Sequence, residues 1–160
     1  MKSQHLKQLA SKVILVTVFM LYNLEGMKAQ NSKTMKNQNS DTISITKVLE
    51  DNYFKGIYEG DVDLLGKAFH PETLLFGDIN DVPYAKTLEQ YLDGVKNRQS
   101  PKDSGKPFEG EILSLHIVNS IAVVEARVRM YDFIYHDILS FHKINGQWFI
   151  VNKMLTDTNQ

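Results

Sequence analysis

Residues 109–157 constrain the fold most strongly, because this last third of the chain predicts four consecutive antiparallel β-strands. Its clearest turn is Asn145-Gly146, since both central positions of a type I′ hairpin turn require positive φ. Residues 121–131 alternate in polarity with a period of two, as expected of a strand with one buried face. Aromatic and β-branched residues are frequent over 135–144. The remainder of the domain must therefore cover one face of an antiparallel sheet.

The segments upstream of these strands predict helices. Apolar side chains recur at helical spacing over about residues 42–59, 62–69 and 88–97. The first helix is expected to be capped by Ser40 or Asp41 and the second by Asp61, while Thr87 and Gln90 fit a capping box for the third. A short strand is expected near residues 73–78, and a surface loop over 98–107. Helices and strands segregated in this way predict an α+β fold, a cone-shaped roll with three N-terminal helices on a strongly bent, mainly antiparallel sheet.

The N-terminal residues predict processing rather than fold. Basic residues precede an apolar run over 13–22, and Ala29 follows as a small residue at a cleavage position, which is typical of a secretory signal peptide. The run is shorter than the roughly 20 residues that span a bilayer. Residues 1–29 are therefore predicted to be a signal peptide, 30–40 a flexible leader and 41–158 a single domain. The mature protein is expected to be secreted or periplasmic, without a stable membrane anchor.

Composition excludes several classes of function. The net charge of −1 gives no electrostatic basis for nucleic-acid binding. The chain has no cysteine, which removes thiolate metal sites, cysteine nucleophiles and lipid attachment through an N-terminal cysteine. The five histidines lack metal-ligand spacing. No metal and no cofactor is therefore predicted.

Several motifs give the chain a resemblance to a known family. The segments are 68–72 (Ala-Phe-His-Pro-Glu), 107–114, Tyr135-His136-Asp137 and 146–153 (Gly-Gln-Trp-Phe-Ile-Val-Asn-Lys). In this order they resemble the nuclear transport factor 2-like superfamily, and within it the branch described as putative lumazine-binding. The resemblance extends over about residues 42–157. It implies the cone-shaped fold of ketosteroid isomerases and polyketide cyclases, and it supports a homodimer. It assigns no catalytic role to any residue of this chain.

The predicted turns sort the sheet into two faces. Two-residue turns are expected at 119–120 and 145–146, and a third turn near 132–133 would place Arg127 opposite Asp137. One face is then more apolar and is assigned to the helices and a cavity. The residues predicted to line this pocket are Tyr53, Phe69, Phe76, Tyr91, His136, Ser140, His142 and Lys153. The other face is either solvated or a dimer interface, and Arg127, Asp137 and Trp148 are predicted to belong to that interface.

Two functions from different classes remain open. The first is an exported binding or accessory domain whose pocket holds a small apolar or aromatic molecule. The second is an isomerase, cyclase or dehydratase that transfers protons in the same pocket, for which His136, His142, Tyr53 and Lys153 are available. The polar residues could equally be satisfied core or rim groups. Lys153 could serve as a Schiff base or general base, or extend to the pocket rim.

Overall fold

The computed structural model describes residues 38–158 of the chain. The predicted signal peptide over 1–29 lies outside these residues, as does most of the predicted leader over 30–40. Residues 38–40 are helical. The first helix therefore begins upstream of the predicted cap at Ser40 or Asp41, and that prediction is wrong.

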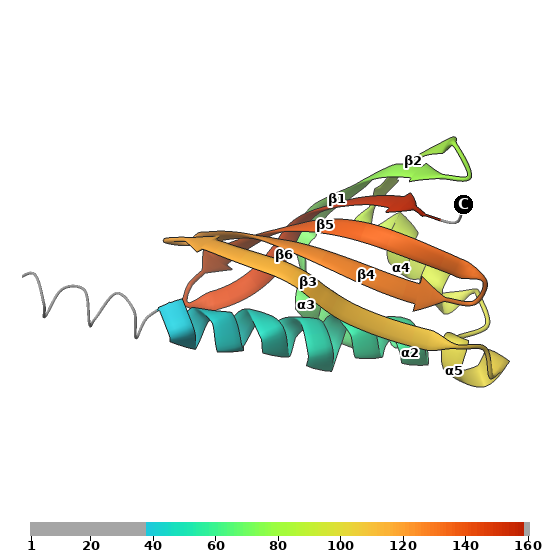
Figure 1. Cartoon of the computed structure of the whole chain (residues 1–160), viewed down its shortest axis with the longest axis horizontal. Coiled ribbons are helices and arrows are strands. Elements are labelled where there is room, and N and C mark those ends of the chain that lie inside the picture. The colour runs from blue at the N-terminus through green and yellow to red at the C-terminus, as the bar shows by residue number, and fades with distance from the viewer. Residues whose placement is uncertain (1–37, 159–160) are drawn as a thin grey trace, which may run out of the picture. The chain divides into compact units, whose positions relative to one another are not determined.

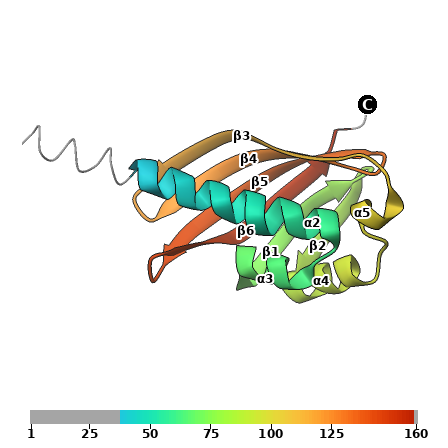
Figure 2. The same ribbon diagram turned by 90° about the horizontal axis from the view of Figure 1, so that it is seen from below.

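A curled six-stranded sheet carries helices on one face (Figures 1 and 2). Its strands are β1 (Phe69–Ile79), β2 (Val82–Thr87), β3 (Phe108–Val118), β4 (Ile121–Met130), β5 (Phe133–Ile144) and β6 (Gln147–Asp157). Their spatial order is β2-β1-β6-β5-β4-β3, and only the β1–β6 pair is parallel. The predicted α+β class and mainly antiparallel sheet are confirmed.

The first helical segment changes its hydrogen-bonding pattern midway. An α-helical stretch reaches residue 47, the π-helix η1 (Val48–Phe54) follows, and α2 (Lys55–Glu59) ends at Gly60 with φ of 69°. The wider π turn lets the consecutive residues Tyr53 and Phe54 both face the core. Phe54 packs directly over Gly110 of β3, where an added Cβ would lie 2.5 Å from its ring.

Three shorter helices complete the layer. They are α3 (Val62–Ala68), α4 (Leu88–Lys96) and α5 (Pro101–Ser104), the last within the predicted loop. Asp61 accepts hydrogen bonds from the backbone nitrogens of Asp63 and Leu64. Thr87 and Gln90 form the complete capping box. Both predicted caps are confirmed, because the short polar side chains satisfy amide groups that have no partner within the helix.

Strand register matches the prediction at two turns and differs at the third. Ile117 pairs with Ala122, and Ile144 pairs with Gln147 across Asn145-Gly146, both as predicted. Between β4 and β5, however, Arg127 pairs with His136 rather than Asp137. The turn uses Tyr131 and Asp132, and Tyr131 adopts a φ of 57°. A register shift of one residue exchanges the two faces along β5.

A β-bulge in β6 shifts the register once more. Phe141 pairs with Ile150, but the next pair is Ser140 with Asn152, which leaves Val151 as the extra residue. The parity of β6 therefore reverses at Val151. Trp148 and Ile150 on one side of the bulge and Lys153 on the other all point into the domain, and all are buried.

Candidate functional site

A cavity of about 170 Å³ lies between the sheet and the helices. The elements that form it, α2, α4 and the strands β1, β2, β4, β5 and β6, meet at one end of the domain (Figures 1 and 2). Its wall is apolar and aromatic with a few charged side chains. The lining residues include Ile57, Ile79, Tyr84, Lys86, Tyr91, Val95, Arg98, Val128, Met130, Tyr135, Asp137, Lys153 and Leu155.

Three side chains form a buried polar cluster at the wall of this cavity. The carboxylate of Asp137 accepts at Oδ2 from the Tyr53 hydroxyl at 2.6 Å and from Lys153 Nζ at 3.0 Å. Lys153 Nζ also donates to the Tyr53 hydroxyl oxygen at 2.5 Å and lies 5.2 Å from the centre of the Tyr53 ring. Asp137 is fully buried and Lys153 is 5% exposed. An ion pair so far from solvent is retained only where its hydrogen bonds are nearly complete.

Two groups in the cavity wall keep unused hydrogen-bonding capacity. Asp137 Oδ1 is buried and has no hydrogen-bonding partner in the described part of the chain. The same holds for Nε and Nη2 of Arg98 among the residues from 38 to 158. Buried polar atoms ordinarily find partners, because an unmade bond costs about 1–3 kcal/mol. Both residues line the cavity, so a molecule bound there could supply the missing partners.

The tyrosines around the cavity remain protonated at neutral pH. Burial raises the pKa of Tyr53 well above 10.0, and the Asp137 carboxylate raises it further. Burial also raises the pKa of Tyr84, Tyr91 and Tyr135, while the positive charge of Arg98 opposes the rise at all three phenols. The guanidinium thus lies in a ring of neutral phenols that can donate or accept hydrogen bonds.

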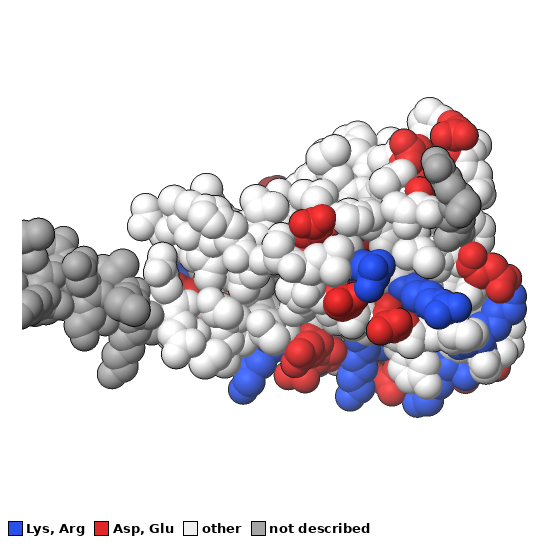
Figure 3. All heavy atoms as spheres, viewed as in Figure 1, with Lys and Arg blue, Asp and Glu red and all other residues white. Residues whose placement is uncertain are grey.

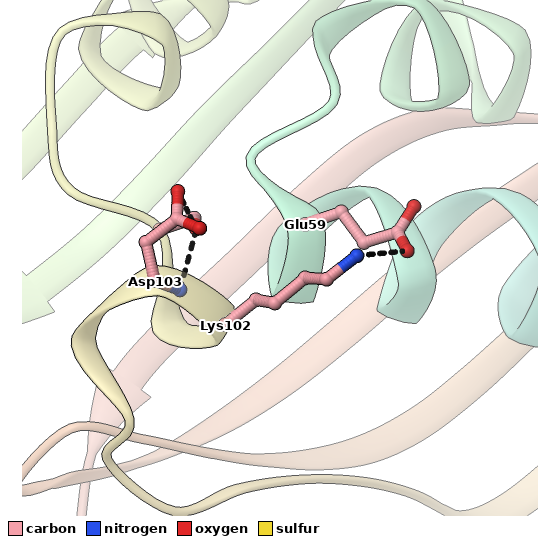
Figure 4. A network of polar contacts seen from close by, with 4 residues as sticks. Glu59, Lys102 and Asp103 are labelled. Atoms are coloured by element: carbon pink, nitrogen blue, oxygen red, sulfur yellow. Dashed lines mark hydrogen bonds and ion pairs between the residues drawn. The ribbon is translucent and has the colours of Figure 1, made fainter.

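The segment that carries Arg98 is anchored by contacts of the two residues that follow it, Gln99 and Ser100. Tyr131 donates to the backbone carbonyl of Gln99, and the buried Ser100 caps α5 by accepting from the Asp103 amide at 3.0 Å. Figure 4 shows the same region, where Lys102 Nζ reaches Glu59 at the end of α2 at 3.2 Å. That ion pair is exposed and contributes little, so the cap and the carbonyl contact hold the segment.

Of the predicted pocket residues, Tyr91 and Lys153 line the cavity. Tyr53 lies behind the wall and reaches it through Asp137, and Phe69 packs edge-to-face against Tyr53 and Tyr91 in the core. Phe76 is 45% exposed. It lies on the outer face, since Leu75 is its inward-facing neighbour, and its assignment to the pocket is wrong.

The predictions for three residues of β5 are also wrong. His136, Ser140 and His142 lie on the outer face because the β4–β5 register differs by one residue from the expected one. His136 Nε2 contacts Glu125 Oε1 there at 2.7 Å. The inward positions of β5 are Tyr135, Asp137, Leu139 and Phe141.

The three residues predicted to form the interface do not lie on one face of the sheet, because the register differs from the expected one. Arg127 lies on the outer face, where it pairs with Glu111. Asp137 faces the cavity instead, and Trp148 is 3% exposed and donates to Asp41 Oδ1 at 3.1 Å. Asp137 and Trp148 are therefore not available to an outer-face interface in this fold.

Sequence reasoning missed Arg98, Tyr84 and Lys86. Tyr84 and Lys86 lie in β2, an edge strand whose Pro83 argues against a central strand but is tolerated at an edge. Tyr84 and Lys86 are half-buried between exposed neighbours in the structure, but the residues of this strand show no alternation of polarity that identifies them. Arg98 follows α4 in a segment with no periodicity, and no sequence pattern identifies it.

Residues 38–158 contain neither a candidate membrane span nor a candidate metal cluster. No helix in this range is long and apolar enough to cross a membrane. Within the same residues, no cluster of three or more histidine, aspartate or glutamate side chains could hold a metal ion.

Known structures share this fold. An NTF2-like protein of unknown function from Shewanella baltica is 21% identical, with a TM-score of 0.67 over 76% of this chain and 96% of that one. A second from Methylobacillus flagellatus is 23% identical, with a TM-score of 0.66 over 75% and 94%. A third from Silicibacter pomeroyi is 18% identical, with a TM-score of 0.65 over 74% and 98%. No curated protein matches the chain.

The family is established by sequence. A family model with the description "Putative lumazine-binding" matches residues 40–156, which is nearly the whole described domain. This match shows that the chain belongs to the "Putative lumazine-binding" family, and its fold is the one found in the NTF2-like proteins above.

Proposed function

We propose that this domain binds a small, ring-sized organic molecule in the cavity beside Asp137. The observation that carries the proposal is the pair of buried, unpartnered polar groups, Asp137 Oδ1 and the Arg98 guanidinium edge, in a wall that is otherwise mainly aromatic and apolar. Few polar groups in an apolar pocket are typical of small-molecule sites. A cavity of about 150 Å³ is known to admit benzene, and this one measures about 170 Å³. The description of the family supports a small-molecule ligand.

Capture of a ligand from a metabolite pool tests the proposal. The purified protein is incubated with the pool, washed and examined by native mass spectrometry. Val128→Phe should fill the cavity and abolish capture, because Val128 lines it. Arg129→Phe is the matched control, since Arg129 is on the same strand but is exposed on the opposite face. Equal capture by both folded variants would contradict the proposed site.

Export is part of the same proposal. The basic start, short apolar run and Ala29 of the N-terminal sequence support removal of residues 1–29. N-terminal sequencing of the protein secreted by a host cell tests it. An intact N-terminus on exported protein would contradict the signal-peptide interpretation.

We also propose that two copies associate through the outer face of the sheet. Its exposed apolar side chains include Leu74, Phe76, Val118, Ile121, Val123, Ile138 and Met154. Cross-strand register brings Phe76, Met154 and Ile138 side by side. Figure 3 shows a broad area without charged side chains over the ends of β3 and β4. Exposed apolar side chains gathered on one face are typical of an interaction site.

Sedimentation tests the dimer. Phe76→Lys with Met154→Lys should shift the protein to monomer, because two desolvated charges would face the partner. Ile43→Lys is the control, since Ile43 is exposed on the helix rather than the sheet. A wild-type protein that remains monomeric at high concentration would exclude the interface.

A second candidate function is proton transfer in the same cavity. It is favoured by Asp137, a buried carboxylate with a free oxygen facing the cavity, as a general base requires. Cyclohexanone in deuterated buffer is a suitable probe, because a positioned base would exchange the protons next to its carbonyl. Exchange above the buffer rate that is lost when Val128→Phe fills the cavity would support an enzyme, and exchange at the buffer rate would favour binding alone.

A further inference from the structure

The lining of the cavity carries an excess of positive charge. Lys86, Arg98 and Lys153 are cationic, and Asp137 is its one carboxylate among the described residues. Asp137 neutralises Lys153 at 3.0 Å. Lys86 lies over the Tyr84 ring at 5.1 Å, and within residues 38–158 neither Lys86 nor Arg98 forms an ion pair. The cavity therefore favours an anion over a neutral molecule of the same shape.

The free atoms of Arg98 specify the kind of anion. Nε and Nη2 form one edge of the planar guanidinium, and both are buried without a partner in the described chain. This edge presents two parallel N–H donors, which match the two oxygens of a carboxylate. Gln99 and Ser100 are anchored next to Arg98, so the backbone that carries this edge is held in place.

Asp137 specifies a second feature of the ligand. Its Oδ2 is occupied by Tyr53 and Lys153, whereas Oδ1 is buried and accepts no hydrogen bond from the described residues. A carboxylate oxygen can only accept. A ligand that fills the cavity must therefore bring an O–H or N–H group to this oxygen, or leave it unsatisfied.

We propose that the ligand is a monocyclic carboxylate that also carries a hydroxyl or amino donor. Its carboxylate binds the Nε and Nη2 edge of Arg98, its donor binds Asp137 Oδ1, and its ring packs among Tyr84, Tyr91 and Tyr135. This inference rests on the proposed function and names the class of ligand for the same cavity.

Four matched probes separate the two contacts. They are 3-hydroxybenzoate, 4-hydroxybenzoate, benzoate, which lacks the donor, and 4-hydroxybenzamide, which lacks the charge. Binding constants are measured by calorimetry, and methyl chemical shifts of Val128, Met130 and Leu155 report whether the probe occupies the cavity. At least one hydroxybenzoate should bind about tenfold more tightly than benzoate and than the amide.

Substitutions at two arginines locate the charge contact. Arg98→Gln should remove the preference for the acid over the amide. Arg127→Gln should preserve it, because Arg127 lies on the outer face with Glu111. The donor contact is tested from the ligand side, since Asp137→Asn also breaks a buried ion pair and could prevent folding.

Each outcome separates the ligand class from the proposed function. An amide that binds the cavity as tightly as the acids, or an acid preference that survives Arg98→Gln, would overturn the carboxylate while leaving a binding cavity. Benzoate binding as tightly as both hydroxybenzoates would overturn the donor contact. Failure of all four probes would overturn the inference, and the proposed function would fail with it only if native mass spectrometry also captured nothing.

Discussion

Replacing Lys153 by methionine should destabilise the protein far more than an ordinary surface substitution. Methionine keeps most of the length of the side chain and removes the ammonium group. Lys153 and Asp137 have side-chain exposures of 6% and 0%, so the change leaves a buried carboxylate without its counter-ion. Stranding one member of such a pair costs about 3–5 kcal/mol. This is a large part of the total stability of a domain, which is typically about 5–15 kcal/mol.

Urea unfolding followed by circular dichroism measures the free-energy change. Lys143→Met is the matched control, because Lys143 pairs with Asp41 at 2.6 Å but is 34% exposed, and such a pair contributes about 0–1 kcal/mol. The double variant Lys153→Met with Asp137→Leu should be more stable than Lys153→Met alone, since no charge is left buried. A Lys153→Met cost no larger than that of Lys143→Met would refute the buried ion pair.

Three further predictions concern pH and packing. Because the pKa values of Tyr53 and Tyr91 are raised, the folded state retains protons that the unfolded chain releases near pH 10.0. The free energy of unfolding should therefore fall as pH rises above that value, and Tyr53→Phe should make this fall less steep in unfolding titrations. Desolvation raises the pKa of Asp41, but hydrogen bonds from Lys143 and Trp148 outweigh it and the net pKa is lowered from 3.8. Its contribution is therefore present above pH 3.8 and lost as pH falls through the folded pKa, and Asp41→Asn should flatten that acid limb in tryptophan fluorescence. Gly110→Ala should lower the melting temperature, because a Cβ there would lie 2.5 Å from the Phe54 ring, at a cost of about 1–3 kcal/mol. Gly66→Ala should raise it, because this glycine lies on the open surface of the helix α3, where alanine is favoured over glycine.

Turn chemistry determined which parts of the sheet could be predicted from sequence. Asn145-Gly146 adopts positive φ at both residues, as its composition requires, and the flanking register follows. At the β4–β5 turn, Tyr131 takes a φ of 57°. Positive φ is rare for a bulky aromatic residue, so sequence rules do not place the turn there. Because the predicted turn was displaced by one residue, His136 was assigned to the cavity and Asp137 to the outer face, and the structure places each on the opposite face.

Lys153 lies on the inward-facing side of the sheet, where it was expected, because two deviations from the predicted register cancel. The β4–β5 register error reverses the parity of the strands that follow, and the bulge at Val151 reverses it again for the second half of β6. A bulge depends on local backbone geometry and has no reliable signature in the residues. The polar cluster could not be predicted for a related reason, because Tyr53 and Asp137 are 84 residues apart and meet only when helix and sheet have packed.

That separation in sequence has a consequence for the order of folding. The hairpins of β3, β4, β5 and β6 join neighbours along the chain, whereas parallel pairing of β1 with β6 joins residues such as Leu75 and Lys153. Contacts between residues so distant in sequence require closure of a long loop and form slowly. We expect the hairpin sheet to assemble first and the β1–β6 pair to form late. Since β1 and β2 both contribute side chains to the cavity wall, we expect the cavity to be the last part of the domain to be completed.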